Sequence, residues 1–114
     1  MIQISVAKDF TKTPGFRYES QSPKISGELF RTSKLLPAYL KALETNEKLE
    51  VNLDGTAGYL TSFLEEAFGG LQRDYRKKGI RCNILDIITI VSNEEPHWKG
   101  AIDGYVQREI KKYK

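Results

Sequence analysis

Residues 51–71, VNLDGTAGYLTSFLEEAFGGL, contain the stretch of sequence that decides the fold. The stretch opens with the end of a short strand, residues 48–54, in which apolar side chains occupy alternate positions. A polar loop follows, and apolar side chains then recur at helical spacing from about Phe63 to Lys78. The pattern therefore predicts a strand, a loop and a helix in immediate succession.

The rest of the chain repeats this alternation. The expected elements are strands at 2–7, 16–20 and 80–88, a helix from Ser26 that is kinked or restarted at Pro37, and a last helix after Pro96. Strands that alternate with helices favour a parallel sheet. We therefore expect an α/β fold, a small mixed but mainly parallel sheet of about four strands and three helices, in a single domain spanning 1–114.

Each expected helix has an apolar face that predicts its side of the core. The first helix should bury a stripe of Leu29, Ser33, Leu36, Leu40 and Leu43. The helix after the loop should bury Phe63, Leu64, Phe68 and Leu71 against the sheet and turn Glu65, Glu66, Arg73 and Arg76 outward. Gly69 and Gly70 each cost about 1 kcal/mol relative to alanine in a helix, so they indicate close packing there, on the sheet; a break in the helix is the alternative.

Two adjacent hydroxyls stand at the start of the second helix. Ser62 and Glu65 have the spacing of a capping box, in which the serine caps the helix and the glutamate bonds back to it. Thr61 is then a spare hydroxyl next to unpaired helix amides, a position that favours anions. A phosphate on Thr61 would be tolerated by the helix and would disfavour an apolar partner.

The sequence offers few residues for catalysis or for binding a cofactor. It has no phosphate-binding loop, and its single histidine, His97, has only Glu94 and Glu95 beside it, so we expect no metal, no cofactor and no enzymatic activity. Arg17, in the segment PGFRYES, has two interpretations: an exposed arginine on an edge strand, which is favoured, or a partner for a carboxylate. The single Cys82 is typical of a reducing compartment, and no secretion signal is recognised, so a cytoplasmic location is expected.

The basic residues concentrate in two segments. Residues 73–81 carry a net charge of +4 and residues 108–114 carry +3, whereas the whole chain carries +3. Both segments fall at expected helix C-termini, where cations complement the helix dipole. That interpretation is favoured; the alternative is a nucleic-acid-associated protein that uses these two clusters.

The central stretch also resembles a known family. The strand VNLD, the hydroxyl pair Thr61-Ser62 and the helix FLEEAFGGL are similar to the strand, loop and helix of STAS domains, the fold of bacterial anti-sigma factor antagonists. The resemblance is closer to the STAS-like domains of unknown function, which also carry a segment like SGELFR, here residues 26–31. The chain departs from the antagonist pattern at Leu60, where an acid is usual, and at Phe63, where a glycine is usual.

The resemblance implies a regulatory, partner-switching protein of bacterial type that binds other proteins and lacks enzymatic activity. Its partner would be a histidine-kinase-like ATPase or an anti-sigma-type regulator, bound through the loop and helix around Thr61 and Ser62. Asp54, Tyr59 and Glu65 are the further candidate contacts, and Thr61 is the candidate phosphorylation site. Nucleic acid and membranes are not expected partners.

Overall fold

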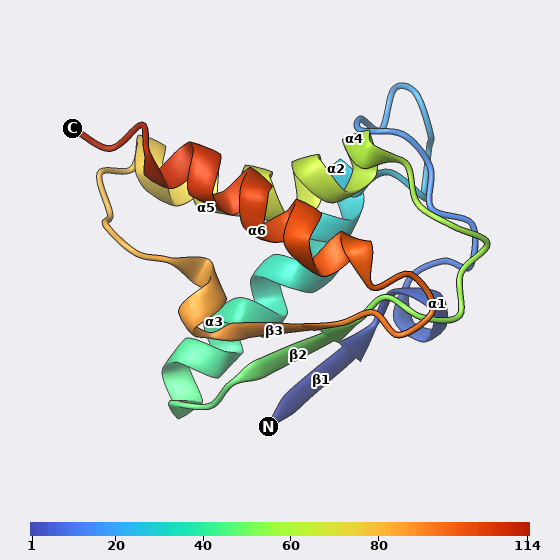
Figure 1. Ribbon diagram of the computed structural model, residues 1–114, viewed down its shortest axis with the longest axis horizontal. Helices are drawn as coiled ribbons and strands as arrows, with labels where there is room; N and C mark the ends of the chain where they lie inside the picture. Colours follow the sequence, from blue (N-terminus) through green and yellow to red (C-terminus); the bar gives the residue numbers. More distant parts are fainter.

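A computed structural model, which describes residues 1–114, contains one sheet of three parallel strands (Figure 1). The strands are β1 (Ile2–Ser5), β2 (Leu49–Asn52) and β3 (Ile88–Val91), in the order β1-β2-β3. The register pairs Ile4 with Val51 and Val51 with Ile90. The predicted parallel α/β fold class is therefore confirmed.

The helices account for most of the remaining regular structure. They are α1 (Val6–Asp9), α2 (Gly27–Phe30), α3 (Leu36–Thr45), α4 (Thr61–Leu64), α5 (Gly70–Lys77) and α6 (His97–Ile110), with the π-helical turns η1 (Arg31–Leu35) and η2 (Glu65–Gly69) and the 3₁₀ turn η3 (Ile84–Asp86). Because η1 joins α2 to α3 and η2 joins α4 to α5, the chain forms two long helices, 27–45 and 61–77. No helix is both long enough and apolar enough to span a bilayer.

The helices pack on one face of the sheet. In β2 and β3 the side chains of Leu49, Val51, Ile88 and Ile90 are buried, whereas Thr89 between them is exposed. The ring of Tyr39 in α3 lies 5.7 Å from that of Tyr75 in α5, so the two long helices meet over the same face. The predicted core residues Phe63, Leu64, Phe68 and Leu71 are all fully buried in this layer.

Pro37 explains an irregular turn in the first long helix. Proline lacks an N–H and clashes with the carbonyl four residues earlier, so a regular α-helix cannot continue through it unchanged. The turn η1 comes just before Pro37, and there the N–H of Leu36 bonds to the carbonyl of Arg31, five residues back. The interruption that the sequence predicts at Pro37 is thus a π turn.

The π turn also corrects the predicted buried stripe. An extra residue in a turn rotates every later side chain around the helix axis. The buried positions are accordingly Phe30, Leu35, Tyr39 and Ala42, with a spacing of five residues across η1. Leu40 and Leu43, which the uninterrupted pattern predicted to be buried, are 49% and 47% exposed.

The glycine pair in the second long helix packs against other helices and not against the sheet. A Cβ on Gly69 would lie 3.4 Å from the Cβ of Tyr105 in α6, and a Cβ on Gly70 would lie 3.1 Å from Nε of Arg31. The prediction of close packing is confirmed, but its partner was predicted wrongly. Gly69 leaves room for the carboxylate of Glu65, with which a Cβ at that position would collide, and Gly70 lets the side chain of Arg31 approach the helix.

Two predicted strands do not form as expected. Residues 16–20 make bends and turns, because Gly15 and Phe16 bond through their N–H groups to Ile25 and Ser22 and so fold this segment back on itself. Residues 80–83 are irregular and 84–86 form η3, where the Asn83 side chain caps the turn by accepting the N–H of Leu85 at 2.9 Å. The strand begins only at Ile88.

Candidate protein-binding site

The segment SGELFR forms the support of the candidate site. Ser26 caps α2 as predicted, since its Oγ accepts the N–H of Leu29 at 3.0 Å. The next residue, Gly27, has to be a glycine because α2 touches α4 there. A Cβ on Gly27 would lie 2.5 Å from the carbonyl oxygen of Phe63. Phe30 then enters the core, where its ring packs 5.8 Å from that of Phe63. The segment 26–31 is thus the surface on which the start of the second long helix rests.

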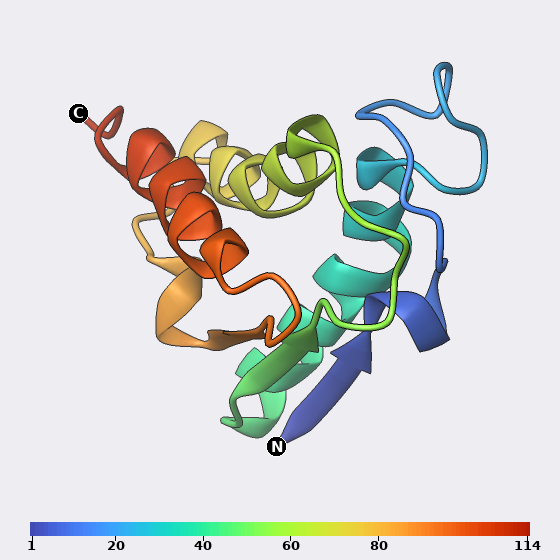
Figure 2. The ribbon, with the colours of Figure 1, turned by 45° about the vertical axis from the view of Figure 1, so that its right-hand side comes forward.

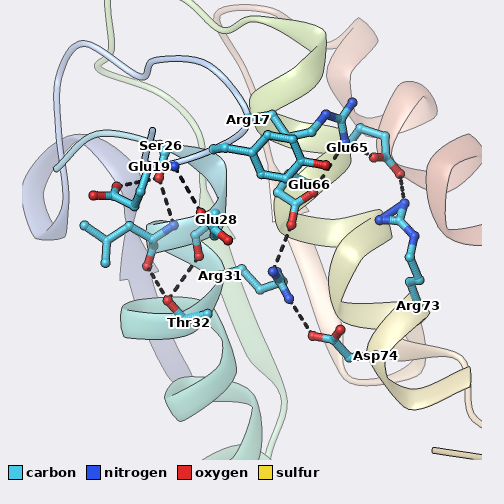
Figure 3. Close-up of polar contacts among 12 residues, drawn as sticks. Arg17, Glu19, Ser26, Glu28, Arg31, Thr32, Glu65, Glu66, Arg73 and Asp74 are labelled. Carbon is cyan, nitrogen blue, oxygen red and sulfur yellow. Dashed lines mark hydrogen bonds and ion pairs between the residues drawn. The ribbon is translucent and has the colours of Figure 1, made fainter. Parts of the chain in front are cut away.

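Arg31 completes the support with two ion pairs across the helices (Figure 3). Its Nη2 lies 2.8 Å from Glu66 and its Nη1 lies 2.5 Å from Asp74. The side chain of Glu66 is only 8% exposed, so the prediction that Glu66 faces outward is wrong. A buried carboxylate needs such a partner, because an unpaired charge inside the protein is strongly unfavourable.

Arg17 anchors the loop between α1 and α2 to the same helix. Its guanidinium pairs with Glu65 and lies 3.5 Å from Glu66, and Figure 3 shows it reaching across from the loop to these carboxylates. Burial opposes the charge of Arg17, yet the hydrogen bonds and charges of Glu65 and Glu66 together outweigh that effect and hold the pKa of the guanidinium above its ordinary value. Of the two interpretations of Arg17, the carboxylate partner is the observed one.

These pairs prevent the predicted capping box. Glu65 accepts Arg17 on one oxygen and Arg73, at 2.6 Å, on the other. It therefore does not bond back to the start of the helix, and no side chain caps α4. The helix begins two residues earlier than predicted, with Leu60 as the extended residue before it, and Ser62 lies inside the first turn. The prediction that Ser62 is the cap is wrong.

The start of α4 is nevertheless exposed to solvent, as a contact between Thr61 and a partner would require. Thr61 is exposed and Ser62 is partly buried. Leu60, just before them, is 41% exposed, and the loop held by Arg17 exposes Phe16 and Tyr18 at 52% and 47%. Apolar side chains thus lie exposed on the two segments that Arg17 and Glu65 connect. We call Leu60 and Thr61, at the start of α4, the α4 surface.

The remaining predicted contacts hold the loop before α4 in place. Asp54 accepts the N–H groups of Asn93 and Glu94, both at 2.9 Å, which ties this loop to the one after β3. The hydroxyl of Tyr59 donates to the carbonyl of Leu53 at 2.7 Å, and burial raises the pKa of that hydroxyl. Asp54 and Tyr59 therefore fix the approach to Leu60 and Thr61, and both are largely engaged within the domain.

The basic residues of the second long helix divide into two groups. Arg73 and Arg76 form ion pairs, with Glu65 and with Glu109 of α6 at 3.2 Å, and are partly buried. Lys77 and Lys78, at the end of the helix, are exposed and have no carboxylate within ion-pair distance. Only the second group is free to act on a ligand.

The structure assembles no group of three His, Cys, Asp or Glu side chains that could hold a metal ion. Near His97, the carboxylate of Glu94 instead accepts the N–H of Gly55 at 2.7 Å. Glu94 is thus used to join the two loops at the C-terminal ends of β2 and β3.

The fold and these contacts define a small parallel α/β domain whose strand-loop-helix unit rests on the segment SGELFR. A family model described as a STAS-like domain of unknown function matches residues 26–98, more than half of the chain. The chain therefore belongs to this STAS-like family, as its sequence resemblance predicted. No curated protein and no solved structure matches it.

The range that matches the family model begins and ends at residues with clear structural roles. It begins at Ser26, which caps α2, and ends at Trp98, which packs edge-on against Tyr59 at 6.2 Å. Sequence reasoning identified both segments, 26–31 and 61–71, but missed that Arg31 joins them through Glu66. The one feature of the sequence that could have indicated this link was Glu66 itself, a charged residue directly beside the apolar stripe of its helix.

Proposed function

We propose that the domain is a non-enzymatic regulatory module that binds a protein partner through the α4 surface. The observation that carries the proposal is the exposure of Leu60 and Thr61 at the start of a helix whose nearby charges are already paired. Exposed apolar side chains beside a polar group are typical of protein interfaces. Membership of a STAS-like family supports the same role, because STAS domains commonly act by binding proteins.

The resemblance to anti-sigma factor antagonists suggests the partner and its regulation. The partner is a histidine-kinase-like ATPase or an anti-sigma-type regulator, and Thr61 is its phosphorylation target. A phosphate on Thr61 would place about two negative charges next to Leu60, where an apolar partner surface would have to desolvate them. Phosphorylation would therefore release the partner.

The test compares two exposed leucines in a tagged domain. Leu60→Asp should abolish co-purification with the proposed partner, a histidine-kinase-like ATPase, whereas Leu40→Asp, on α3, should retain it. Both side chains are similarly exposed, so neither change should unfold the domain, and melting curves would check this. Equal binding by both variants and the parent would refute the proposed surface.

A second pair of variants tests the switch. Thr61→Ala should change stability by less than about 0.5 kcal/mol, because Thr61 is exposed and caps nothing. Thr61→Glu should melt like the parent and bind the partner more weakly. Incubation of partner, ATP and domain should add one phosphate to the parent and none to Thr61→Ala, as measured by mass spectrometry. Phosphate on another residue would exclude Thr61 as the target.

A further inference from the structure

The two basic clusters, far apart in the sequence, lie side by side in the structure. The C-terminal ends of α5 and α6 are neighbours in both Figure 1 and Figure 2. Arg76 pairs with Glu109, and the hydroxyl of Tyr113 donates to the carbonyl of Ile80 at 2.6 Å, which joins the segment after α5 to the segment after α6. We call residues 73–81 and 108–114 together the basic end.

The charge at this end is large for a small domain. The two segments contain nine basic side chains and two acidic ones, a net charge of +7. Since the whole chain carries +3, the remaining residues carry −4. The molecule is therefore strongly polarised, with its positive charge gathered where two helices end.

Few of these cations are neutralised. Glu109 is shared by three of them, Arg73, Arg76 and Lys112, and Asp74 is engaged by Arg31. The three cations hold the pKa of Glu109 below its ordinary value although burial opposes its charge. The exposed basic side chains without an ion-pair partner are Lys77, Lys78, Arg81, Arg108, Lys111 and Lys114. Of these, Arg81 donates to the main-chain oxygen of Lys114.

Helix dipoles do not account for so much charge. Each helix C-terminus carries about half of a negative charge, and its effect fades within one turn. Two such ends offset about one of seven positive charges. The favoured sequence interpretation, in which each cluster only complements its own helix, therefore leaves most of this charge unexplained. The alternative given with it, a nucleic-acid-associated protein that uses both clusters, requires them to act together.

The basic end also contains a hollow. It has a volume of about 280 Å³ and is lined by Arg76, Gly79, Arg81, Lys112, Tyr113 and Lys114. The guanidinium of Arg81 lies over the ring of Tyr113 at 5.5 Å, which holds the arginine at the rim. An anionic group that entered the hollow would meet four basic side chains.

We propose that the basic end binds the phosphate backbone of a nucleic acid, without reading its sequence, as an activity additional to the α4 surface. Among large apolar side chains only Ile80 is exposed there, at 46%, so the apolar centre typical of a protein interface is lacking. Lysines and arginines alone are sufficient for a phosphate backbone, because binding is driven by the release of its counterions.

The experiment measures the anisotropy of a fluorescent, mixed-sequence DNA duplex as protein is added at several salt concentrations. Contacts by Lys77, Lys78, Arg81 and Lys111 with four phosphates would give a log–log slope of about −3.6. Affinity should then fall about 150-fold over about a fourfold rise in salt. No binding at low salt, or binding that salt does not weaken, would overturn the proposal.

A charge-matched pair of variants locates the site. Lys77→Glu with Lys78→Glu and Lys111→Glu should abolish duplex binding, whereas Lys12→Glu with Lys34→Glu and Lys41→Glu should retain it with at most a few-fold loss. All six lysines are exposed, so both variants should remain folded. Reversal at the ends of α5 and α6 should lower the melting temperature modestly, because glutamate there opposes the helix dipole. Equal losses of duplex affinity in the two variants would show an effect of net charge alone and would overturn the assignment of the site to the basic end.

A competition experiment tests whether the ligand of the basic end is an acidic protein instead of a nucleic acid. Unlabelled duplex should displace the labelled duplex from the parent at a far lower concentration of negative charges than polyglutamate does. If polyglutamate competes equally well, the basic end is a surface for acidic proteins, and the nucleic-acid proposal is wrong. Leu60→Asp should bind duplex like the parent, so failure of the α4 surface and failure of this proposal can be told apart.

Discussion

The helix from Thr61 to Lys77 has two ends with opposite surface chemistry. At its start the charges of Glu65 and Glu66 are paired with arginines, and what remains exposed is apolar Leu60 and neutral Thr61. At its finish Lys77 and Lys78 are exposed without partners. The difference teaches that paired, buried charges belong to the support of a site, whereas unpaired ones are available to a ligand.

The largest expected effect is on the helix core that joins the two ends. The Phe68 side chain is fully buried, so Phe68→Ala should lower the free energy of unfolding by about 3–5 kcal/mol, as aromatic truncations in cores do. Chemical denaturation measures this loss. A near-neutral result would mean that the two ends are not held by one rigid helix.

The next effect tests whether the paired charges at the start are support. Arg31→Leu removes the ion pair between Arg31 and Glu66 and leaves the buried carboxylate to Arg17 alone, which should cost about 3 kcal/mol of stability. Arg108→Leu is the control, since Arg108 is exposed and unpaired, and should cost less than about 0.5 kcal/mol. Similar losses in both variants would contradict the distinction between paired and unpaired charges.

A smaller effect separates two serines that the sequence predicted to be caps. Ser26→Ala removes the observed cap of α2 and should cost about 1 kcal/mol. Ser62→Ala removes no cap and should stay within about 0.5 kcal/mol of the parent. Thermal melting of the two variants side by side decides between them. A larger loss for Ser62→Ala would restore the capping box.

The last effect concerns pH at the other end of the helix. Because the folded-state pKa of Glu109 lies below its ordinary value of 4.5, the folded protein binds fewer protons there than the unfolded chain does. Its contribution to stability is therefore present above about pH 4.5 and is lost as the pH falls through the folded-state value. Melting from neutral to acid pH should show a weaker dependence for Glu109→Gln; an unchanged dependence would contradict these ion pairs.

Much of the fold followed from local patterns in the sequence. Pro96 and the apolar stripe through Trp98, Ile102 and Val106 located α6, and alternation located β1 and β2. The buried face of residues 63–71 was also predicted correctly. In these places local periodicity and tertiary packing require the same arrangement.

The errors arose where distant contacts decided the outcome. Residues 16–18 alternate like a strand, but Arg17 is held by Glu65, 48 positions away. The same contact removed Glu65 from its capping box. Ile84 lies in an apolar run, yet its N–H bonds to the side chain of buried Gln72 at 3.0 Å, in a turn and not in a strand. Spacing along the chain contains no information on such partners.

The measurement that tests the central claim most directly is a titration of two variants with both the protein partner and the DNA duplex. One variant is Leu60→Asp, and the other reverses the charges of Lys77, Lys78 and Lys111 to glutamate. The account predicts that Leu60→Asp loses the protein and keeps the duplex, and that the triple reversal does the opposite. Loss of both ligands in either folded variant, or loss of neither in both, would contradict the assignment of separate functions to the two ends of the helix.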